Sequence, residues 1–84
     1  SSMRALANGV GIPDILRMVR DIRGRTGVPI VLFSYLNPLY RYGLANLAAD
    51  AADAGVDGVL VTDAVDDEAV EISQTLRSRG IDLI

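Results

Sequence analysis

The chain has 84 residues, with eight arginines, no lysine, eleven acidic residues and a formal net charge of −3. This balance gives no positive field of the kind that nucleic acids or anionic membranes bind, so neither is an expected partner. Cysteine and histidine are both absent, which excludes disulfides and thiolate metal sites and removes the commonest metal ligand and general base. Carboxylates and tyrosines remain for any chemistry, and no metal site is predicted.

The two ends of the sequence indicate a piece of a larger domain. It begins with "SSMRALANGV", a helix-like segment that Asn8-Gly9 would end, and it stops at "IDLI", which is typical of the start of a strand. No signal peptide is recognisable, and no apolar stretch approaches the ~20 residues of a membrane span. We expect residues 1–84 to be a fragment of one cytoplasmic domain, which would be unstable or self-associating alone because its sheet edges are open.

The first complete helix and strand are predicted from the spacing of apolar residues. In "PDILRMVRDIRGRTG" these residues recur at helical spacing, at Ile15, Met18, Val19 and Ile22. They predict an amphipathic helix that ends near Gly24 or Gly27. The continuous apolar run over residues 28–35 then predicts a strand buried on both faces, which ends at an Asn-Pro turn.

The rest of the chain repeats this alternation. A second helical stripe consists of Leu44, Leu47, Ala48 and Ala51, and Gly55 supplies its stop. A strand over residues 56–63 follows, and the apolar positions of a third helix are Val65, Ala69, Ile72 and Leu76. Strand starts are separated by roughly the 25–30 residues of a βα unit. We therefore predict about three parallel strands with intervening helices, in part of a (β/α)₈ TIM barrel or in an open doubly wound sheet.

The acidic stretch "TDAVDDE" combines two kinds of position. Asp63 ends a buried strand, where α/β folds place their sites, so it has either a functional role or an ordinary loop hydrogen bond. Asp66, Asp67 and Glu68 suit the first turn of a helix, which they cap and whose dipole they complement. Their spacing does not match a calcium-binding loop.

An aromatic cluster stands where the first buried strand ends. The stretch "VLFSYLNPLYRYG" holds all three tyrosines and the single phenylalanine. Because strand side chains alternate between faces, Phe33 and Tyr35 share one face, and Leu60 and Thr62 share a face of the next strand. Such residues either fill a core or line a recognition site. In a barrel, one such set would point inward near the catalytic end and could wall an aromatic substrate.

Several of these segments resemble, in order and spacing, the α subunit of tryptophan synthase. The matching stretches are "SSMRALANGV", "PIVLFSYLNPLYRYGL", "DAGVDGVLVTD" and "GIDLI", and together they cover essentially the whole chain. The most specific part runs from Tyr35 to Gly43, whereas Gly55 to Gly58 is shared more widely among phosphate-binding barrels. The resemblance implies a (β/α)₈ barrel of which this chain is about a third.

The resemblance also implies an activity for the whole protein. The family cleaves indole-3-glycerol phosphate by a retro-aldol step, giving indole and glyceraldehyde 3-phosphate, and needs no cofactor. One carboxylate acts as general acid-base and an aspartate assists at the indole nitrogen. In the family both carboxylates precede the segment matched by Ser1, so we expect no catalytic residue in this chain and no lyase activity from the chain alone.

Site residues are carried over from the family position by position. Phe33, Leu60 and Thr62 fall on positions that line the indole pocket, and Tyr35 falls beside the catalytic aspartate. We assign Asp63 a supporting role at the same site.

A partner surface is implied as well. Four residues of the Asn-Pro turn match the family's surface that faces the β subunit, the partner that receives indole through a tunnel: Asn37, Pro38, Tyr40 and Arg41. The expected assembly is a heterotetramer.

The clearest departure from the family follows Asp63. The family usually continues with Leu-Pro-Pro-Glu-Glu, whereas this chain has no proline from Ala64 to Glu68, which should loosen the loop.

Two alternative functions remain open. Another phosphate-binding barrel enzyme would share Gly55 to Gly58 without needing the aromatic turn. A receiver-like signalling module would use Asp63 as phosphoacceptor, but it requires an acidic pair after an earlier strand, which the sequence lacks.

Overall fold

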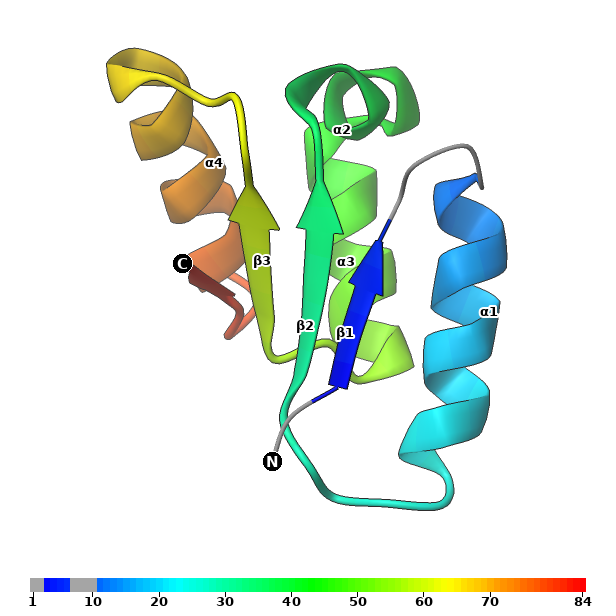
Figure 1. Ribbon diagram of the computed structural model, residues 1–84. Coiled ribbons are helices and arrows are strands. Elements are labelled where there is room, and N and C mark those ends of the chain that lie inside the picture. Colours follow the sequence, from blue (N-terminus) through cyan, green and yellow to red (C-terminus); the bar gives the residue numbers. More distant parts are fainter. Residues whose placement is uncertain (1–2, 7–10) are drawn as a thin grey trace.

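The structure, a computed structural model, describes residues 3–6 and 11–84, and of residues 3–6 only the backbone (Figure 1). In chain order its elements are β1 Met3–Leu6, α1 Ile12–Arg23, β2 Ile30–Ser34, α2 Leu36–Tyr42, α3 Leu44–Ala54, β3 Gly58–Val61, α4 Asp66–Arg77 and β4 Asp82–Leu83. This alternation of strands and helices confirms the α/β class. Within the described ranges, no helix is long and apolar enough to cross a membrane.

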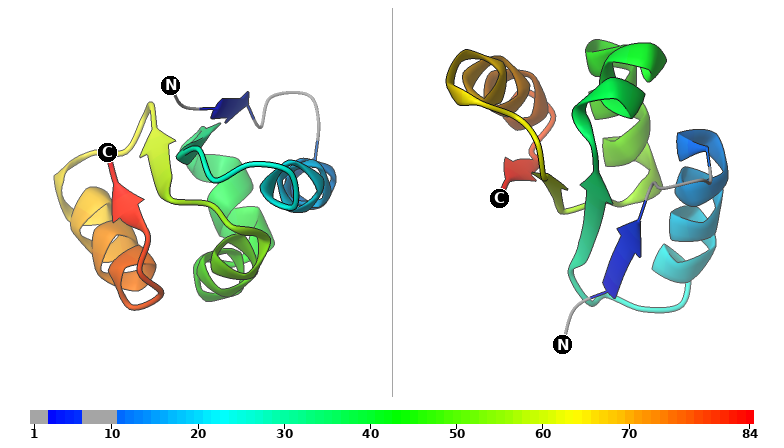
Figure 2. Two further views of the ribbon diagram at one scale, coloured as in Figure 1. Left: turned by 90° about the horizontal axis from the view of Figure 1, so that it is seen from below. Right: turned by 45° about the horizontal axis from the view of Figure 1, so that its top comes forward.

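The strands form one parallel sheet whose spatial order, β1-β2-β3-β4, is their order in the chain. The two views in Figure 2 show α1, α3 and α4 against the same face of this sheet. A doubly wound sheet reverses its strand order and carries helices on both faces. Over these elements the chain instead winds in one direction, as the (β/α)₈ barrel requires.

The beginning of the chain differs from the helix predicted there. Met3–Leu6 form the strand β1, which pairs in parallel with β2. The physical reason is that β2 would otherwise present unpaired backbone groups along this edge, and an extended segment satisfies them whereas a helix does not. The sheet therefore has four strands instead of about three. The predicted helix end at Asn8-Gly9 lies outside the described residues.

The predicted Asn-Pro turn is also wrong, because residues 36–42 form the helix α2. Pro38 occupies its third position, where a missing N–H breaks no intrahelical bond. Gly43, with a φ of 97°, separates α2 from α3. Tyr35 is the N-cap of α2, so the preceding strand ends one residue earlier than predicted, at Ser34.

The core lies between the sheet and the helices that cover it. Along β2, Ile30, Leu32 and Ser34 are buried, whereas Val31 and Phe33 between them are half-buried. The buried helix residues are Ile12, Ile15, Leu16 and Val19 of α1, Leu47, Ala48, Ala51 and Ala54 of α3, and Ile72 and Leu76 of α4. Full burial of one large aliphatic side chain contributes about 1.5–3 kcal/mol, so this face holds the helices on the sheet.

Two residues predicted on core faces are exposed. Met18 of α1 is 49% exposed, because the buried stripe of α1 passes instead through Ile12 and Leu16. Val65 is 66% exposed, because it precedes the first turn of α4 and stands at its N-cap. The remaining residues predicted for the stripes of the last two helices are at least partly buried.

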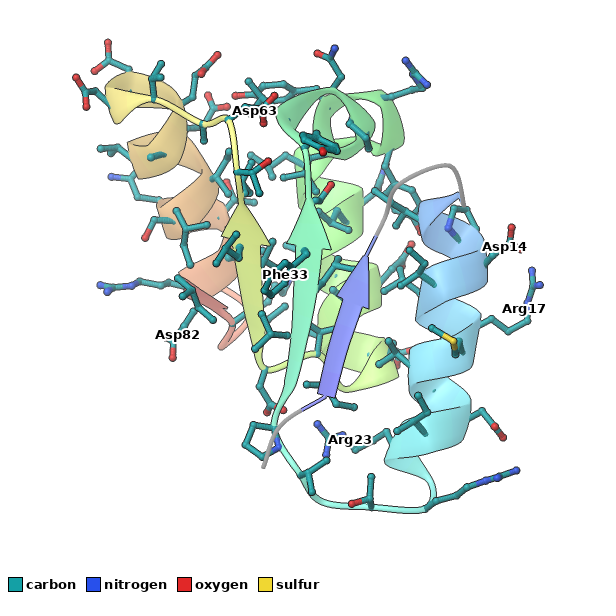
Figure 3. The ribbon with its side chains drawn as sticks, viewed as in Figure 1. Asp14, Arg17, Arg23, Phe33, Asp63 and Asp82 are labelled. Atoms are coloured by element: carbon teal, nitrogen blue, oxygen red, sulfur yellow. The ribbon has the colours of Figure 1, made fainter. Side chains whose placement is uncertain are left out.

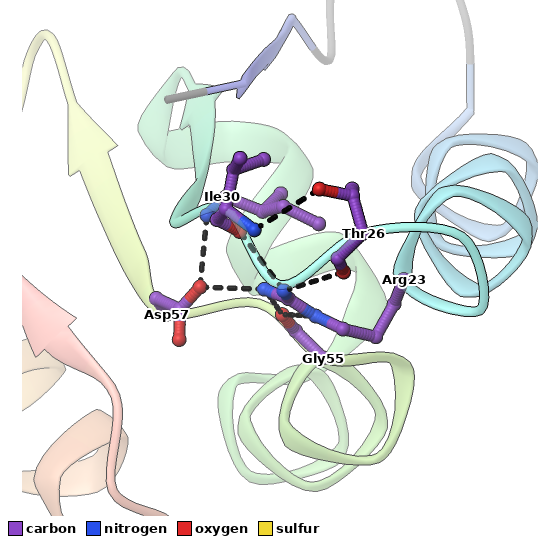
Figure 4. A network of polar contacts seen from close by, with 6 residues as sticks. Arg23, Thr26, Ile30, Gly55 and Asp57 are labelled. Carbon is purple, nitrogen blue, oxygen red and sulfur yellow. Dashed lines mark hydrogen bonds and ion pairs between the residues drawn. The ribbon is translucent and has the colours of Figure 1, made fainter. Parts of the chain in front are cut away.

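A polar network joins three segments at the N-terminal ends of the strands (Figure 4). The guanidinium of Arg23 donates hydrogen bonds to the carbonyl of Gly55 (2.7 and 3.2 Å), the carbonyl of Val28 (2.9 Å) and the carbonyl of Thr26 (3.2 Å). It also forms an ion pair with Asp57, with Nη2 and Oδ2 2.6 Å apart. The end of α1 is thereby tied to the turn between α3 and β3.

Gly55 is required in this network for two reasons. Its φ of 103° lies in the left-handed region, which glycine adopts without strain. A Cβ at this position would also stand 2.7 Å from Cγ and 2.8 Å from Nε of Arg23. The bonded guanidinium prevents the arginine stem from moving away, so a larger residue cannot be accommodated without breaking bonds.

We therefore expect Gly55→Ala to lower the free energy of unfolding by about 1–3 kcal/mol, through backbone strain and displacement of Arg23. Urea denaturation of the whole barrel domain that contains this segment measures this loss. Gly27→Ala is the matched control, since nothing lies within 4 Å of a Cβ there, and should stay within about 0.5 kcal/mol of the parent. Equal losses in both variants would contradict the role given to Gly55.

Candidate functional site

The candidate site lies at the C-terminal ends of β2 and β3, at the upper edge of the sheet in Figure 1. In (β/α)₈ barrels the loops at this edge carry the reactive residues, whereas the opposite edge contributes stability. Phe33 and Leu60 belong to the two strands, and Tyr35 and Thr62 follow directly after them. The Gly55 to Gly58 stretch leads from α3 into β3 at the opposite edge, beside the Arg23 network.

The structure places Phe33 and Leu60 side by side. They are register partners in the parallel pair of β2 and β3. The preceding residues of the two strands, Leu32 and Val59, are fully buried on the face that the helices cover. Because strand side chains alternate, Phe33 and Leu60 share the opposite face, which no described helix covers (Figure 2). Figure 3 labels Phe33 on the strand β2. The sequence paired Phe33 with Tyr35 and Leu60 with Thr62, and the register of β2 and β3 adds that Phe33 and Leu60 are neighbours.

Tyr35 and Thr62 stand one residue beyond these strands. The Thr62 N–H donates to the carbonyl of Ser34 over 3.1 Å, which extends the pairing of β2 and β3 past their last residues. Ser34 is buried, and its hydroxyl donates to the carbonyl of Tyr35 over 2.8 Å. Tyr35 is 44% exposed and Thr62 is exposed too, so both residues are accessible at this edge of the sheet.

Asp63 makes a hydrogen bond across this edge. Its Oδ1 accepts from the backbone N–H of Leu36, the first residue of α2, over 2.6 Å. Of the two roles considered for Asp63, the structure therefore shows the loop hydrogen bond. This bond counts against the alternative in which Asp63 is the phosphoacceptor of a receiver module.

The other acidic residues of this stretch begin α4, as predicted. Asp66, Asp67 and Glu68 form its first turn, and Oε1 of Glu68 accepts from the N–H of Val65 over 3.3 Å. Such residues complement the positive end of the helix dipole. Among the described residues, no cluster of three or more carboxylates could hold a metal ion.

The residues predicted to face a partner are gathered on α2. Asn37, Tyr40 and Arg41 are exposed and Pro38 is half-buried. Between them Leu39 is fully buried and anchors the helix to the core. The helix thus presents polar and aromatic side chains to solvent directly beside the site.

Two tyrosines tie α2 to its neighbours. The hydroxyl of Tyr40 donates to Oε1 of Glu71 in α4 over 3.3 Å, and the hydroxyl of Tyr42 donates to Oδ2 of Asp50 in α3. Partial desolvation, followed by the charge of Glu71, raises the pKa of Tyr40. The hydrogen bond to Asp50, followed by burial, raises the pKa of Tyr42. Neither contact was predicted from the sequence, because each joins residues of separate elements.

A sheet wound in one direction, with its helices on one face and accessible side chains at the C-terminal edge, defines the class of protein: this is a segment of a (β/α)₈ barrel. All residues from 1 to 84 match the family model described as tryptophan synthase alpha chain. The chain belongs to the tryptophan synthase alpha chain family.

Individual relatives agree with this assignment. The chain is 51% identical over 84 residues to the tryptophan synthase alpha chain of Geobacter sulfurreducens and 50% identical to that of Citrifermentans bemidjiense. In both cases the match covers all of this chain but only 32% of the relative. The chain therefore spans about a third of the length of the curated relatives that it matches.

Solved structures give the same result. The alpha chain from Legionella pneumophila superposes with a TM-score of 0.85 at 35% identity, over 93% of this chain and 30% of that one. A tryptophan synthase complex from Pyrococcus furiosus superposes with a TM-score of 0.81 at 38% identity, over 90% of this chain and 32% of that one.

The raised pKa of Tyr42 leads to a pH-dependence prediction. Because its folded pKa lies above the unfolded value of about 10, the bond to Asp50 stabilises the fold fully below about pH 10 and is lost as pH rises through the folded pKa. Tyr42→Phe should therefore lose less stability than the parent between neutral pH and about pH 11, as measured by urea denaturation. An unchanged alkaline loss in Tyr42→Phe would count against the bond.

Proposed function

We propose that these residues belong to a tryptophan synthase alpha chain that cleaves indole-3-glycerol phosphate to indole and glyceraldehyde 3-phosphate, and hence to a carbon-carbon lyase of tryptophan biosynthesis. The observation that carries this proposal is the family match over the whole chain, residues 1 to 84. The placement of the predicted pocket residues at the C-terminal edge of the sheet supports it.

The part assigned to this segment is one wall of the substrate pocket. An indole ring is flat and largely apolar, and it gains most from contact with an aromatic and an aliphatic side chain on one surface. Phe33 and Leu60 supply such a surface, since they are register partners on the uncovered face of the sheet. Tyr35 and Thr62 add a phenol and a hydroxyl directly beyond them, where the polar part of the substrate and the acid-base group would meet.

The proton transfers are assigned to carboxylates outside this segment. Asp63 is the acidic residue nearest in sequence to the proposed wall, and its Oδ1 already accepts the bond from Leu36 N–H. A general acid-base must exchange protons with the substrate within hydrogen-bonding distance. We therefore give Asp63 a supporting role and expect the catalytic pair in the remainder of the protein.

The exposed side of α2 is assigned to a β subunit, the partner that would receive the indole. Asn37, Tyr40 and Arg41 offer amide, phenol and guanidinium groups on one short helix that borders the proposed pocket. Tyrosine and arginine are enriched among residues that dominate protein interfaces. One of the solved structures that resemble this chain is a tryptophan synthase complex.

The first test is a chimera in which residues 1–84 replace the matching segment of the Geobacter sulfurreducens alpha chain, which is 51% identical there. We expect the purified chimera to release indole from indole-3-glycerol phosphate and to do so faster with a β subunit, whereas the 84-residue chain alone should release none. The alpha chain of Geobacter sulfurreducens is the positive control. A chimera that is folded by circular dichroism yet inactive in both conditions would overturn the proposal and favour another phosphate-binding barrel enzyme.

The pocket wall has a test of its own in the same chimera. Phe33→Ala should lower kcat/KM for indole-3-glycerol phosphate about ten- to a hundredfold, because the ring loses its aromatic contact. Met18→Ala, which truncates an exposed side chain on the outer helix α1, should leave kcat/KM unchanged. If the two variants have the same kcat/KM, Phe33 does not contact the substrate.

A further inference from the structure

The helix α2 is held in place by polar bonds as well as by apolar burial. Of its seven residues, Leu39 is the one that is fully buried, and Leu36 and Tyr42 are only partly buried against the core. Three side-chain hydrogen bonds connect it to its surroundings: Leu36 N–H donates to Asp63, Tyr40 to Glu71 and Tyr42 to Asp50. The position of such a helix depends on these bonds.

The bond from Asp63 differs from the two tyrosine bonds because it caps the helix. The N-cap of α2 is Tyr35, whose side chain makes no capping hydrogen bond. The first N–H groups of any helix lack intrahelical partners. Here a carboxylate from 27 positions further along the chain satisfies one of them at 2.6 Å, and its charge suits the positive end of the helix.

The carboxylate itself is held from both sides. Directly before it, the Thr62 N–H is bonded to the carbonyl of Ser34. Two residues after it, the Val65 N–H is bonded to Glu68 in the first turn of α4. Asp63 therefore stands on a fixed backbone between β3 and α4, and it can define where α2 begins.

We propose that Asp63 is a positioning residue for the partner surface: by capping α2 from the loop after β3, it fixes the helix that carries Asn37, Tyr40 and Arg41. This inference rests on the proposed function. The affinity for a β subunit then depends on Asp63 through the bond to Leu36 N–H, without contact between Asp63 and the partner.

The test measures the dissociation constant of the β subunit for the chimera by isothermal titration calorimetry, together with the circular dichroism spectrum of each variant. Asp63→Ala should raise the dissociation constant about tenfold, the effect of losing one charge-assisted hydrogen bond. Asp63→Asn keeps an acceptor oxygen and should recover part of that loss. Recovery of affinity by Asp63→Asn, with unchanged circular dichroism spectra for both variants, separates the lost cap from a general loss of folded protein.

Two further variants make the result specific. Asp67→Ala removes an exposed carboxylate of the same acidic stretch that is not bonded to α2, and it should leave the dissociation constant unchanged. Leu36→Pro removes the donor N–H at the first helical position, where proline is tolerated, and the extended backbone of Tyr35 (φ −89°, ψ 166°) suits a residue before proline. In the Leu36→Pro background, Asp63→Ala should have no additional effect.

The outcomes separate the inference from the proposed function. A folded chimera that neither binds a β subunit nor forms indole would overturn both. A chimera that binds normally, with Asp63→Ala equal to it in affinity, would overturn the positioning role alone. Fully additive effects of Leu36→Pro and Asp63→Ala would also overturn that role, because the effects of residues that act through one bond do not add.

Discussion

The pairing of Asp57 with Ile30 is the constraint on which the rest of the structure depends. The Asp57 N–H donates to the carbonyl of Ile30 over 2.9 Å, and Oδ2 of Asp57 accepts from the Ile30 N–H over 2.8 Å while also bound to Arg23. This double contact sets the register of β2 and β3 where both begin. Three residues further along, the same register places Phe33 beside Leu60. A slip by one residue would turn one of these side chains to the helix-covered face.

The two edges of the sheet are built from different interactions. At the N-terminal edge, one arginine joins α1, the start of β2 and the turn before β3, around a glycine that admits no side chain. At the C-terminal edge, α2 lies on a small apolar base and is held by single hydrogen bonds from three directions. The N-terminal edge therefore fixes the register of the strands, whereas the C-terminal edge holds α2 by individual hydrogen bonds. This division suits a barrel that keeps its fold while its site loops vary.

The sequence was sufficient where local pattern decides the structure. Apolar spacing predicted the helices now called α1, α3 and α4, and the segments between them were predicted as the strands now called β2 and β3. Alternation paired Phe33 with Tyr35 and Leu60 with Thr62, whereas the register of the sheet shows that Phe33 and Leu60 are neighbours. Predictions from the sequence were wrong where contacts between residues distant in the chain decide the local structure. Met3–Leu6 form a strand because the edge of β2 accepts one, and α2 replaces a turn with its cap supplied by Asp63. Spacing at Leu36, Leu39 and Gly43 was the local signal for that short helix, and the Asn-Pro pair obscured it.

The loop after Asp63 shows why the missing prolines do not prevent an ordered edge. Proline acts mainly by reducing the freedom of the unfolded chain, so its absence raises the entropic cost of ordering the loop without removing any contact from the folded state. In the folded state the loop is fixed by backbone pairing at Thr62, by the bond from Asp63 to α2 and by the cap of α4 at Val65. In this chain these hydrogen bonds order the loop without prolines. The order of this loop therefore depends on the carboxylates of Asp63 and Glu68. Because Asp63 also caps α2, the position of that helix depends on one of the same two groups.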